Sequence, residues 1–113
     1  MKIDEILKLD DTQRVTVEIP EWKTSLVVSS MTAIERGEIE KKWNGKKASA
    51  DPVGFRADVL ERSLKDEAGK PLATKEQIGQ LMAKNARAVE RLFAAACEVA
   101  GLTDADAKEI EKN

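Results

Sequence analysis

Alternating apolar and polar residues in one stretch, RVTVEIPEWKTSLVVSS, place the tightest constraint on how this chain can fold. Arg14–Ile19 follows a period of two, and the β-branched run Thr24–Ser29 begins after a four-residue loop, Pro20–Lys23. This spacing predicts three cross-strand pairs, which are Ile19–Thr24, Val17–Leu26 and Val15–Val28. All three pairs lie on one face, so the loop length and the apolar pattern predict the same antiparallel register.

A two-stranded hairpin is only marginally stable in water, so this one must pack on other elements of the chain. Apolar spacing predicts helices at about 32–43, 52–65 and 75–100, after a short N-terminal helix that contains Ile3, Ile6 and Leu7. Asn85 either divides the last helix in two or lies inside one long helix. Residues 103–113 form an expected short acidic tail helix. The expected fold is mainly α (α+β), a single small helical domain over residues 1–113 with one N-terminal antiparallel β-hairpin.

Several helix ends carry sequence signals of their own. Thr32–Glu35 and Thr74–Gln77 have the spacing of a capping box, in which the first and fourth residues bond each other's backbone N–H groups. Asp51 followed by Pro52 is typical of a capping residue and a first helical residue. Gly101 has the position of a C-terminal cap. These signals predict where the helices begin and end, independently of the apolar pattern.

The composition favours a non-enzymatic protein. The chain of 113 residues has no histidine, which removes the commonest general base and metal ligand, and it contains no glycine-rich phosphate-binding motif. The single cysteine, Cys97, lies among small apolar residues and is expected in the core. We therefore expect no catalytic residue, cofactor or metal site. The start, MKIDEILKLDD, lacks the pattern of a signal peptide, no run is long enough to span a membrane, and a reducing compartment is expected.

Three residues are candidates for binding a protein partner: Trp22, Phe55 and Val59. Trp22 lies at the bend of the hairpin, where it either covers the core or remains exposed as an interface anchor. Phe55 and Val59 fall nearly opposite the Val53–Ala57–Leu60–Leu64 stripe of their helix. That arrangement indicates either a helix buried on both sides or a helix with a partner-binding face.

The run KKWNGKK, Lys41–Lys47, resembles a nucleic-acid-binding loop because lysines flank an aromatic residue that could stack on a base. The formal net charge of −2 argues against this interpretation. We expect Trp43 to face the core and no nucleic acid to bind.

The order of elements resembles the tail assembly chaperones of long-tailed bacteriophages, from Ile6 to Asn113. The resemblance is carried by ILKLDD, VEIPEW, LVVSSMTAIER and the DEAGKPLATKEQI block before an alanine-rich helix. It implies a mainly helical protein of the host cytoplasm that binds the tape-measure protein, keeps it soluble and is absent from the mature virion. It also implies a frameshift-extended form that recruits the tail-tube protein, and self-association is a further expectation. The alternatives are a small nucleic-acid-binding regulator and a structural head–tail joining protein.

The final residues, EKN, can be encoded as GA-A AAA AAC, which contains the slippery heptamer A AAA AAC in the correct frame. In the resembled family the frameshift occurs near the end of the gene. An extension would hold a second binding module close to the shared client and raise its local concentration. Synonymous recoding of Lys112 and Asn113 to AAG AAT should lower the yield of a longer product, measured by immunoblot, and leave this chain unchanged. An unaltered yield, or no longer product from the native gene, would contradict the expectation.

Overall fold

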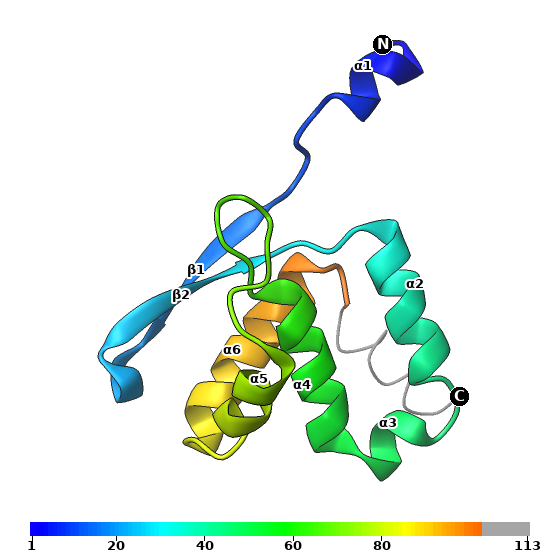
Figure 1. The fold of residues 1–113 in the computed structure, drawn as a ribbon. Coiled ribbons are helices and arrows are strands. Elements are labelled where there is room, and N and C mark those ends of the chain that lie inside the picture. Colours follow the sequence, from blue (N-terminus) through cyan, green and yellow to red (C-terminus); the bar gives the residue numbers. More distant parts are fainter. Residues whose placement is uncertain (103–113) are drawn as a thin grey trace.

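The structure is a computed structural model that describes residues 1–102, so the expected tail helix at 103–113 lies outside the described residues. It is mainly helical with one two-stranded antiparallel sheet, as the sequence predicted (Figure 1). The elements in chain order are α1 (Ile3–Leu7), β1 (Arg14–Ile19), the 3-10 turn η1 (Pro20–Trp22), β2 (Thr24–Ser29), α2 (Ala33–Lys42), α3 (Lys47–Ala50), α4 (Pro52–Ser63), α5 (Lys75–Leu81) and α6 (Ala86–Val99).

The hairpin has the predicted strands and the predicted register. The pairs on the inner face are Ile19–Thr24, Val17–Leu26 and Val15–Val28. Pro20 opens the turn, and the Lys23 N–H closes it by donating to the Pro20 carbonyl at 3.0 Å. Lys23 has φ of 54°, a left-handed conformation that lets the chain reverse within four residues. Val17, Ile19 and Val28 are buried, so the inner face of the sheet forms part of the core.

α6 supplies the surface on which the hairpin packs. It contacts both strands and also α4, so it joins the sheet to the rest of the helices (Figure 1). Its buried residues recur at helical spacing and are Ala88, Val89, Leu92, Ala96 and Cys97. Arg87, Glu90, Arg91 and Glu98 lie on its exposed side. This amphipathic pattern satisfies the requirement that a two-stranded sheet be covered on its apolar face.

The aromatic side chains join α6 to α4 and to the end of α2. Phe55 lies between Trp43 and Phe93, with ring centroids 5.7 Å and 5.9 Å apart and edge-to-face geometry in both pairs. Edge-to-face contacts place the positive ring edge against a negative ring face, which adds to the stabilisation from burial. Gly54 allows this packing, because a Cβ there would collide with the Asp51 side chain and lie 3.0 Å from the Trp43 ring.

A polar network accompanies the aromatic cluster. The buried carboxylate of Asp58 accepts a hydrogen bond from Trp43 Nε1 at 2.9 Å and another from Arg62 Nε at 3.0 Å. Arg62 also donates to Glu38 of α2 at 3.2 Å. A buried carboxylate without partners would be strongly destabilising, and here an indole and a guanidinium provide them. The network therefore fixes the orientation of α2 against α4.

The helix starts follow the sequence signals, and the helix lengths differ from expectation in two places. Residues 75–100 form two helices and not one, because the Asn85 side chain accepts from the Ala88 N–H and caps α6. α4 ends at Ser63 and not near Lys65, because Leu64 leaves the helix and forms an antiparallel bridge with Val28 of the sheet. The short helix α3, which the sequence did not predict, lies in the basic loop before Asp51.

The structure decides whether Phe55 and Val59 belong to the core or to a partner-binding face of α4. Both side chains are buried, as are Leu60 and Leu64, whereas Val53 at the start of the helix is 55% exposed. From Phe55 onward α4 is covered on both sides, by α6 and α5 on one hand and α2 and α3 on the other. Phe55 and Val59 therefore belong to the core of this chain and do not form an exposed partner-binding face, which corrects their assignment as candidate binding residues.

We predict that Phe55→Asp unfolds the protein. The substitution removes a buried ring, at about 3–5 kcal/mol for a change to alanine, and adds the cost of a buried carboxylate. Together these approach the total stability of roughly 5–15 kcal/mol expected for a domain. Val53→Asp, on the exposed first turn of the same helix, should change the midpoint of thermal unfolding by only a few degrees. Circular dichroism melts of both variants test this, and a cooperative, native-like melt of Phe55→Asp would contradict it.

Candidate functional site

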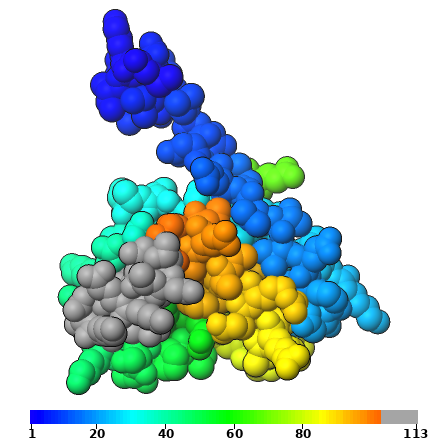
Figure 2. Space-filling view, turned by 180° about the vertical axis from the view of Figure 1, so that it is seen from behind, coloured from blue at the N-terminus to red at the C-terminus, as the bar shows by residue number. Residues whose placement is uncertain are grey.

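The N-terminal arm, residues 1–12, is an apolar feature that the described body of the protein leaves uncovered. α1 stands away from the other elements at the end of an extended segment (Figure 1), and the reverse view shows the same separation (Figure 2). Its apolar residues are all exposed: Met1, Ile3, Ile6, Leu7 and Leu9. Ile3 is 65% exposed and Leu7 is 74% exposed. Because contiguous exposed apolar residues commonly mark an interaction surface, the arm is the first candidate for a binding site.

The arm is amphipathic and too short to be stable as an isolated helix. Ile3, Ile6 and Leu7 lie at positions i, i+3 and i+4, so they share one face. α1 has five residues, whereas isolated helices shorter than about 12–15 residues are marginal in water. Burying one such side chain fully would contribute roughly 1.5–3 kcal/mol. A partner that covered this face would therefore stabilise both the contact and the helix itself.

The base of the arm is fixed to the hairpin. The backbone of Ser30 donates to the Gln13 carbonyl at 2.8 Å, and the Gln13 N–H donates to Ser30 Oγ at 2.9 Å. Asp10 accepts from the Thr12 N–H at 3.1 Å and pairs with Arg14 at 3.5 Å. The hairpin ladder thus continues one residue pair beyond the strands, and this extension sets the direction in which the arm leaves the body.

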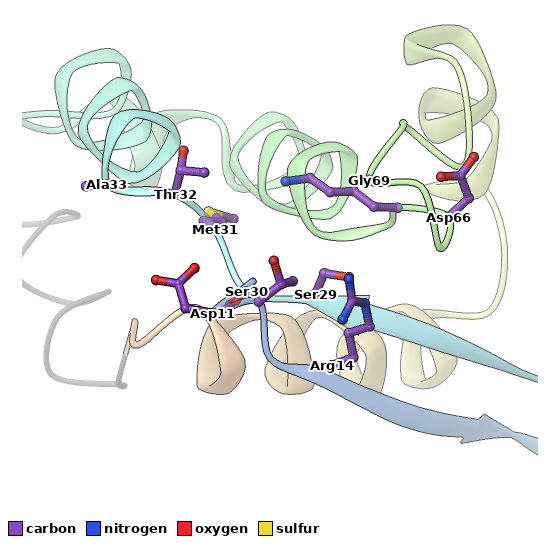
Figure 3. A pocket seen from close by; sticks show the side chains of 11 residues that line it. Asp11, Arg14, Ser29, Ser30, Met31, Thr32, Ala33, Asp66 and Gly69 are labelled. Atoms are coloured by element: carbon purple, nitrogen blue, oxygen red, sulfur yellow. The ribbon is translucent and has the colours of Figure 1, made fainter. Parts of the chain in front are cut away.

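A groove lies beside the base of the arm, between the sheet and the loop that connects α4 to α5. Its polar end, of about 440 Å³, is formed by the start of β1, the end of β2, the start of α2 and the α4–α5 loop (Figure 3). The charges there have partners within the chain. Lys65 Nζ lies 2.8 Å from Glu35, and Asp66 accepts from the backbone N–H groups of Ala68 and Lys70. Lys65 and Asp66 at the polar end are therefore both satisfied by partners within the chain.

The other end of the groove is mainly apolar, and we call it the sheet groove. It has a volume of about 430 Å³ and is lined by Arg14, Thr16, Ser25, Leu26, Val27, Lys65, Asp66, Glu67 and Leu72. Leu72 is held beside the sheet because its N–H donates to the carbonyl of Leu64, which bridges Val28, at 2.9 Å, and it is 49% exposed. Arg14, Lys65 and Asp66 line both ends, so the two hollows are neighbours along one surface. The sheet groove is a second apolar surface that the chain leaves open.

Trp22 lies at the tip of the hairpin and is partly buried. Its side chain packs against the core cluster and retains some exposure, so it covers the core without being enclosed by it. Beside it, Glu21 accepts two hydrogen bonds from the Arg91 guanidinium of α6, at 2.7 Å and 3.0 Å. The bidentate pair and the indole together hold the hairpin tip on α6. Trp22 is therefore mainly a packing residue with a smaller exposed surface.

The contact with Arg91 changes the acidity of Glu21. The hydrogen bonds from the guanidinium are the main cause that lowers the pKa of the Glu21 carboxyl, from 4.5 to about 2. A lowered pKa in the folded state means that the unfolded chain binds the proton more readily. The pair therefore stabilises the fold above the unfolded-state value and loses its contribution as pH falls from about 4.5 through about 2.

We predict that the coupling between Glu21 and Arg91 is present at neutral pH and disappears in acid. A double-mutant cycle with Glu21→Gln, Arg91→Gln and the double variant isolates this pair from other effects of each substitution. The coupling, obtained from thermal or urea unfolding, should fall progressively between about pH 4.5 and about pH 2. A coupling that is zero at pH 7, or that is constant over this range, would show that the contact does not tie the hairpin tip to α6.

Trp43 and Cys97 both lie in the core, as the sequence analysis expected. The Trp43 indole is occupied by its contact with Phe55 and its hydrogen bond to Asp58, and Lys42 Nζ lies 5.5 Å from the centre of its ring. This aromatic side chain is therefore not exposed for stacking on a base. Among residues 1–102, no three His, Cys, Asp or Glu side chains are grouped to hold a metal ion. None of the helices described is long and apolar enough to cross a membrane.

Sequence reasoning identified the helix that contains Ile3, Ile6 and Leu7 but not its role as an exposed surface. The signal was available, because an amphipathic helix of about one turn is followed by Asp10 and Asp11 and is separated from the hairpin. The sheet groove had no such signal, since it is formed by segments about 40 residues apart. Comparison with family models, curated proteins and solved structures finds no match to this chain.

Proposed function

We propose that this chain is a tail assembly chaperone of a long-tailed bacteriophage, which binds the tape-measure protein and keeps it soluble in the host cytoplasm. In this proposal it also helps to recruit tail-tube subunits, through a frameshift-extended form, and is absent from the finished virion. The order of sequence blocks supports the assignment. The observation that carries it is the exposed apolar face of the N-terminal arm, because a holding chaperone needs apolar surface that its own core does not cover.

The chemistry of the client matches this surface. The resemblance implies a client that is long and helical and that must be kept soluble, the tape-measure protein. A short amphipathic helix can bind such a client by laying its apolar face against apolar positions of the client helix. The segment between α1 and β1, which holds no helix or strand, allows α1 to reach a client while the hairpin and helices remain folded. The core residues Phe55 and Val59 support the arm indirectly, by stabilising the body that carries it.

We predict that co-expression of this chain raises the soluble yield of the tape-measure protein several-fold. The paired variant Ile6→Asp, Leu7→Asp should remove most of this gain, because charged residues on the α1 face cannot pack on an apolar client. Val53→Asp is the matched control, since Val53 is also exposed but lies on α4. The measurement is soluble client per cell, by quantitative immunoblot at equal expression.

Two outcomes would overturn the proposal. The first is an equal insoluble fraction of the tape-measure protein with and without this chain. The second is detection of this chain, by mass spectrometry of purified particles, at the stoichiometry of a structural component, which would favour a head–tail joining protein. A soluble yield that the arm variant leaves unchanged would refute the role of α1 in client binding.

A further inference from the structure

We propose that two copies of this chain pair along β1, antiparallel and centred on Thr16, so that their two hairpins form one four-stranded sheet. The interface is the open edge of β1, and it leaves the apolar face of α1 to the proposed client. The direction of the backbone groups on this edge and the order of its charges select a second copy of the chain as the occupant.

The edge of β1 has no strand beside it. In the part of the chain that the structure describes, the sheet has two strands, so β1 pairs with β2 on one edge only. Figure 2 shows the blue residues of β1 at the surface. The corresponding edge of β2 is partly occupied, since Val28 forms a bridge with Leu64 where α4 ends. The six residues of β1 contain no proline or lysine and their register has no bulge, so this edge lacks common devices that prevent strand pairing.

The backbone of every second residue of β1 faces this open edge. The Ser30 N–H donates to the Gln13 carbonyl, and Gln13 lies opposite Ser30 when the register of the strands is continued. In an antiparallel ladder, residues alternate between those whose N–H and C=O groups turn toward the neighbouring strand and those whose groups turn away. Counting from Gln13, the groups of Arg14, Thr16 and Glu18 turn away from β2. These are the positions at which a further strand would form its hydrogen bonds.

The charges on the same three positions are complementary to themselves. Arg14 and Glu18 lie two residues on either side of Thr16, and all three side chains are exposed. When two β1 strands pair antiparallel about Thr16, each Arg14 lies opposite Glu18 of the second copy, and Thr16 lies opposite Thr16. Opposite charges and threonine pairs at directly opposed positions both stabilise a sheet.

Other registers lack this match. A slip of two residues places neither Arg14 nor Glu18 opposite a charge, and a slip of four places two arginines or two glutamates opposite each other. Parallel pairing in register would also align like charges, which is destabilising. The backbone directions and the charges therefore specify the same single register, and a helical client has no strand to offer this edge.

Both charged residues are available for such contacts. Among residues 1–102, Glu18 has no ion-pair partner, and Arg14 has only a long pair with Asp10, at 3.5 Å. An exposed pair of this length contributes little to stability, so a carboxylate of the second copy can replace or join Asp10.

The apolar face of the sheet would also become continuous. A two-fold axis perpendicular to the sheet keeps the inner faces of both hairpins on one side, and it places Val15 of each copy opposite Val17 of the other. Val15 is 44% exposed in the single chain, whereas Val17 is buried, so pairing would cover an apolar residue at the edge of the core.

The helices below the sheet can be accommodated. α6 contacts both strands and so lies beneath the hairpin as a whole. Two strands at a spacing of about 4.8 Å occupy a width of about 10 Å, and neighbouring helices pack about 8–10 Å apart. The two α6 helices would therefore lie side by side beneath the four strands.

Charge reversal tests whether the occupant is a second copy. Sedimentation of the parent chain should show a concentration-dependent dimer. Arg14→Glu alone, or Glu18→Arg alone, places like charges opposite each other at both ends of the interface and should weaken the dimer about ten-fold or more. An equimolar mixture of these two variants should recover the dimer, because every reversed residue then faces an opposite charge. Lys75→Glu, an exposed reversal on α5, is the control and should leave the dimer unchanged.

Proline at the centre of the strand tests the backbone pairing. Because the Thr16 N–H turns away from β2, Thr16→Pro should preserve the hairpin within each chain and remove a donor of the intermolecular ladder. It should weaken the dimer about as much as a charge reversal, with a native-like circular dichroism melt. If Thr16→Pro fails to fold, the charge reversals and their mixture decide the question.

Four outcomes would overturn the proposal. They are a parent chain that is monomeric at all concentrations, single reversals that leave the dimer unchanged, a mixture that does not recover it, and a folded Thr16→Pro variant that dimerises like the parent. The paired arm variant Ile6→Asp, Leu7→Asp should dimerise normally, and loss of the dimer in that variant would also contradict pairing through β1. Because no client is present, these outcomes are independent of the proposed chaperone function.

Discussion

The apolar face of α6 is the constraint on which the rest of the structure depends. A two-stranded hairpin has no second layer of its own, and α6 provides that layer while also packing on α4. Leu92 and Ala96 are fully buried on this face, and Ile19 and Val28 are fully buried on the sheet. At the far end, Arg91 holds Glu21 of the hairpin tip. Loss of this face would leave the sheet unsupported and would open the core between sheet and helices.

The aromatic contacts and hydrogen bonds made by α4 orient the remaining helices. Phe55 bridges the aromatic rings of α2 and α6, and Asp58 binds both Trp43 and Arg62. The aromatic contacts are not strongly directional, whereas the hydrogen bonds to a buried carboxylate require particular donors in particular places. The combination explains how α2, which is mostly charged and has Ile39 as its one buried residue, is nevertheless fixed against α4.

The positions of the sheet groove and of the N-terminal arm follow from the contacts that the chain makes at the ends of α4 and of the hairpin. Leu64 leaves α4 to pair with Val28, and this carries the α4–α5 loop alongside the sheet and forms one wall of the sheet groove. The continuation of the hairpin ladder through Gln13 and Ser30 directs the arm outward. A stable body and an accessible apolar segment are therefore separate parts of one short chain. The proposed chaperone function would use this division, because the arm could bind an apolar client while the core stays covered.

The sequence by itself determined the local features. The hairpin register, both capping boxes and the caps at Asp51 and Gly101 depend on residues within a few positions of one another, and the structure has them where the pattern predicts. Asn85 was ambiguous because an asparagine can cap a helix or lie within one, and the hydrogen bond to Ala88 decides between these.

Only the tertiary structure decided which apolar residues are covered. Phe55 and Ile6 are both apolar residues on amphipathic helices, yet Phe55 is enclosed by two neighbouring helices and Ile6 by none of the described elements. Helical periodicity identifies a face but not what packs against it, because burial depends on contacts between segments distant in sequence. The sheet groove could not be predicted from the sequence for the same reason. Val27 and Leu72 become neighbours only after Leu64 joins the sheet.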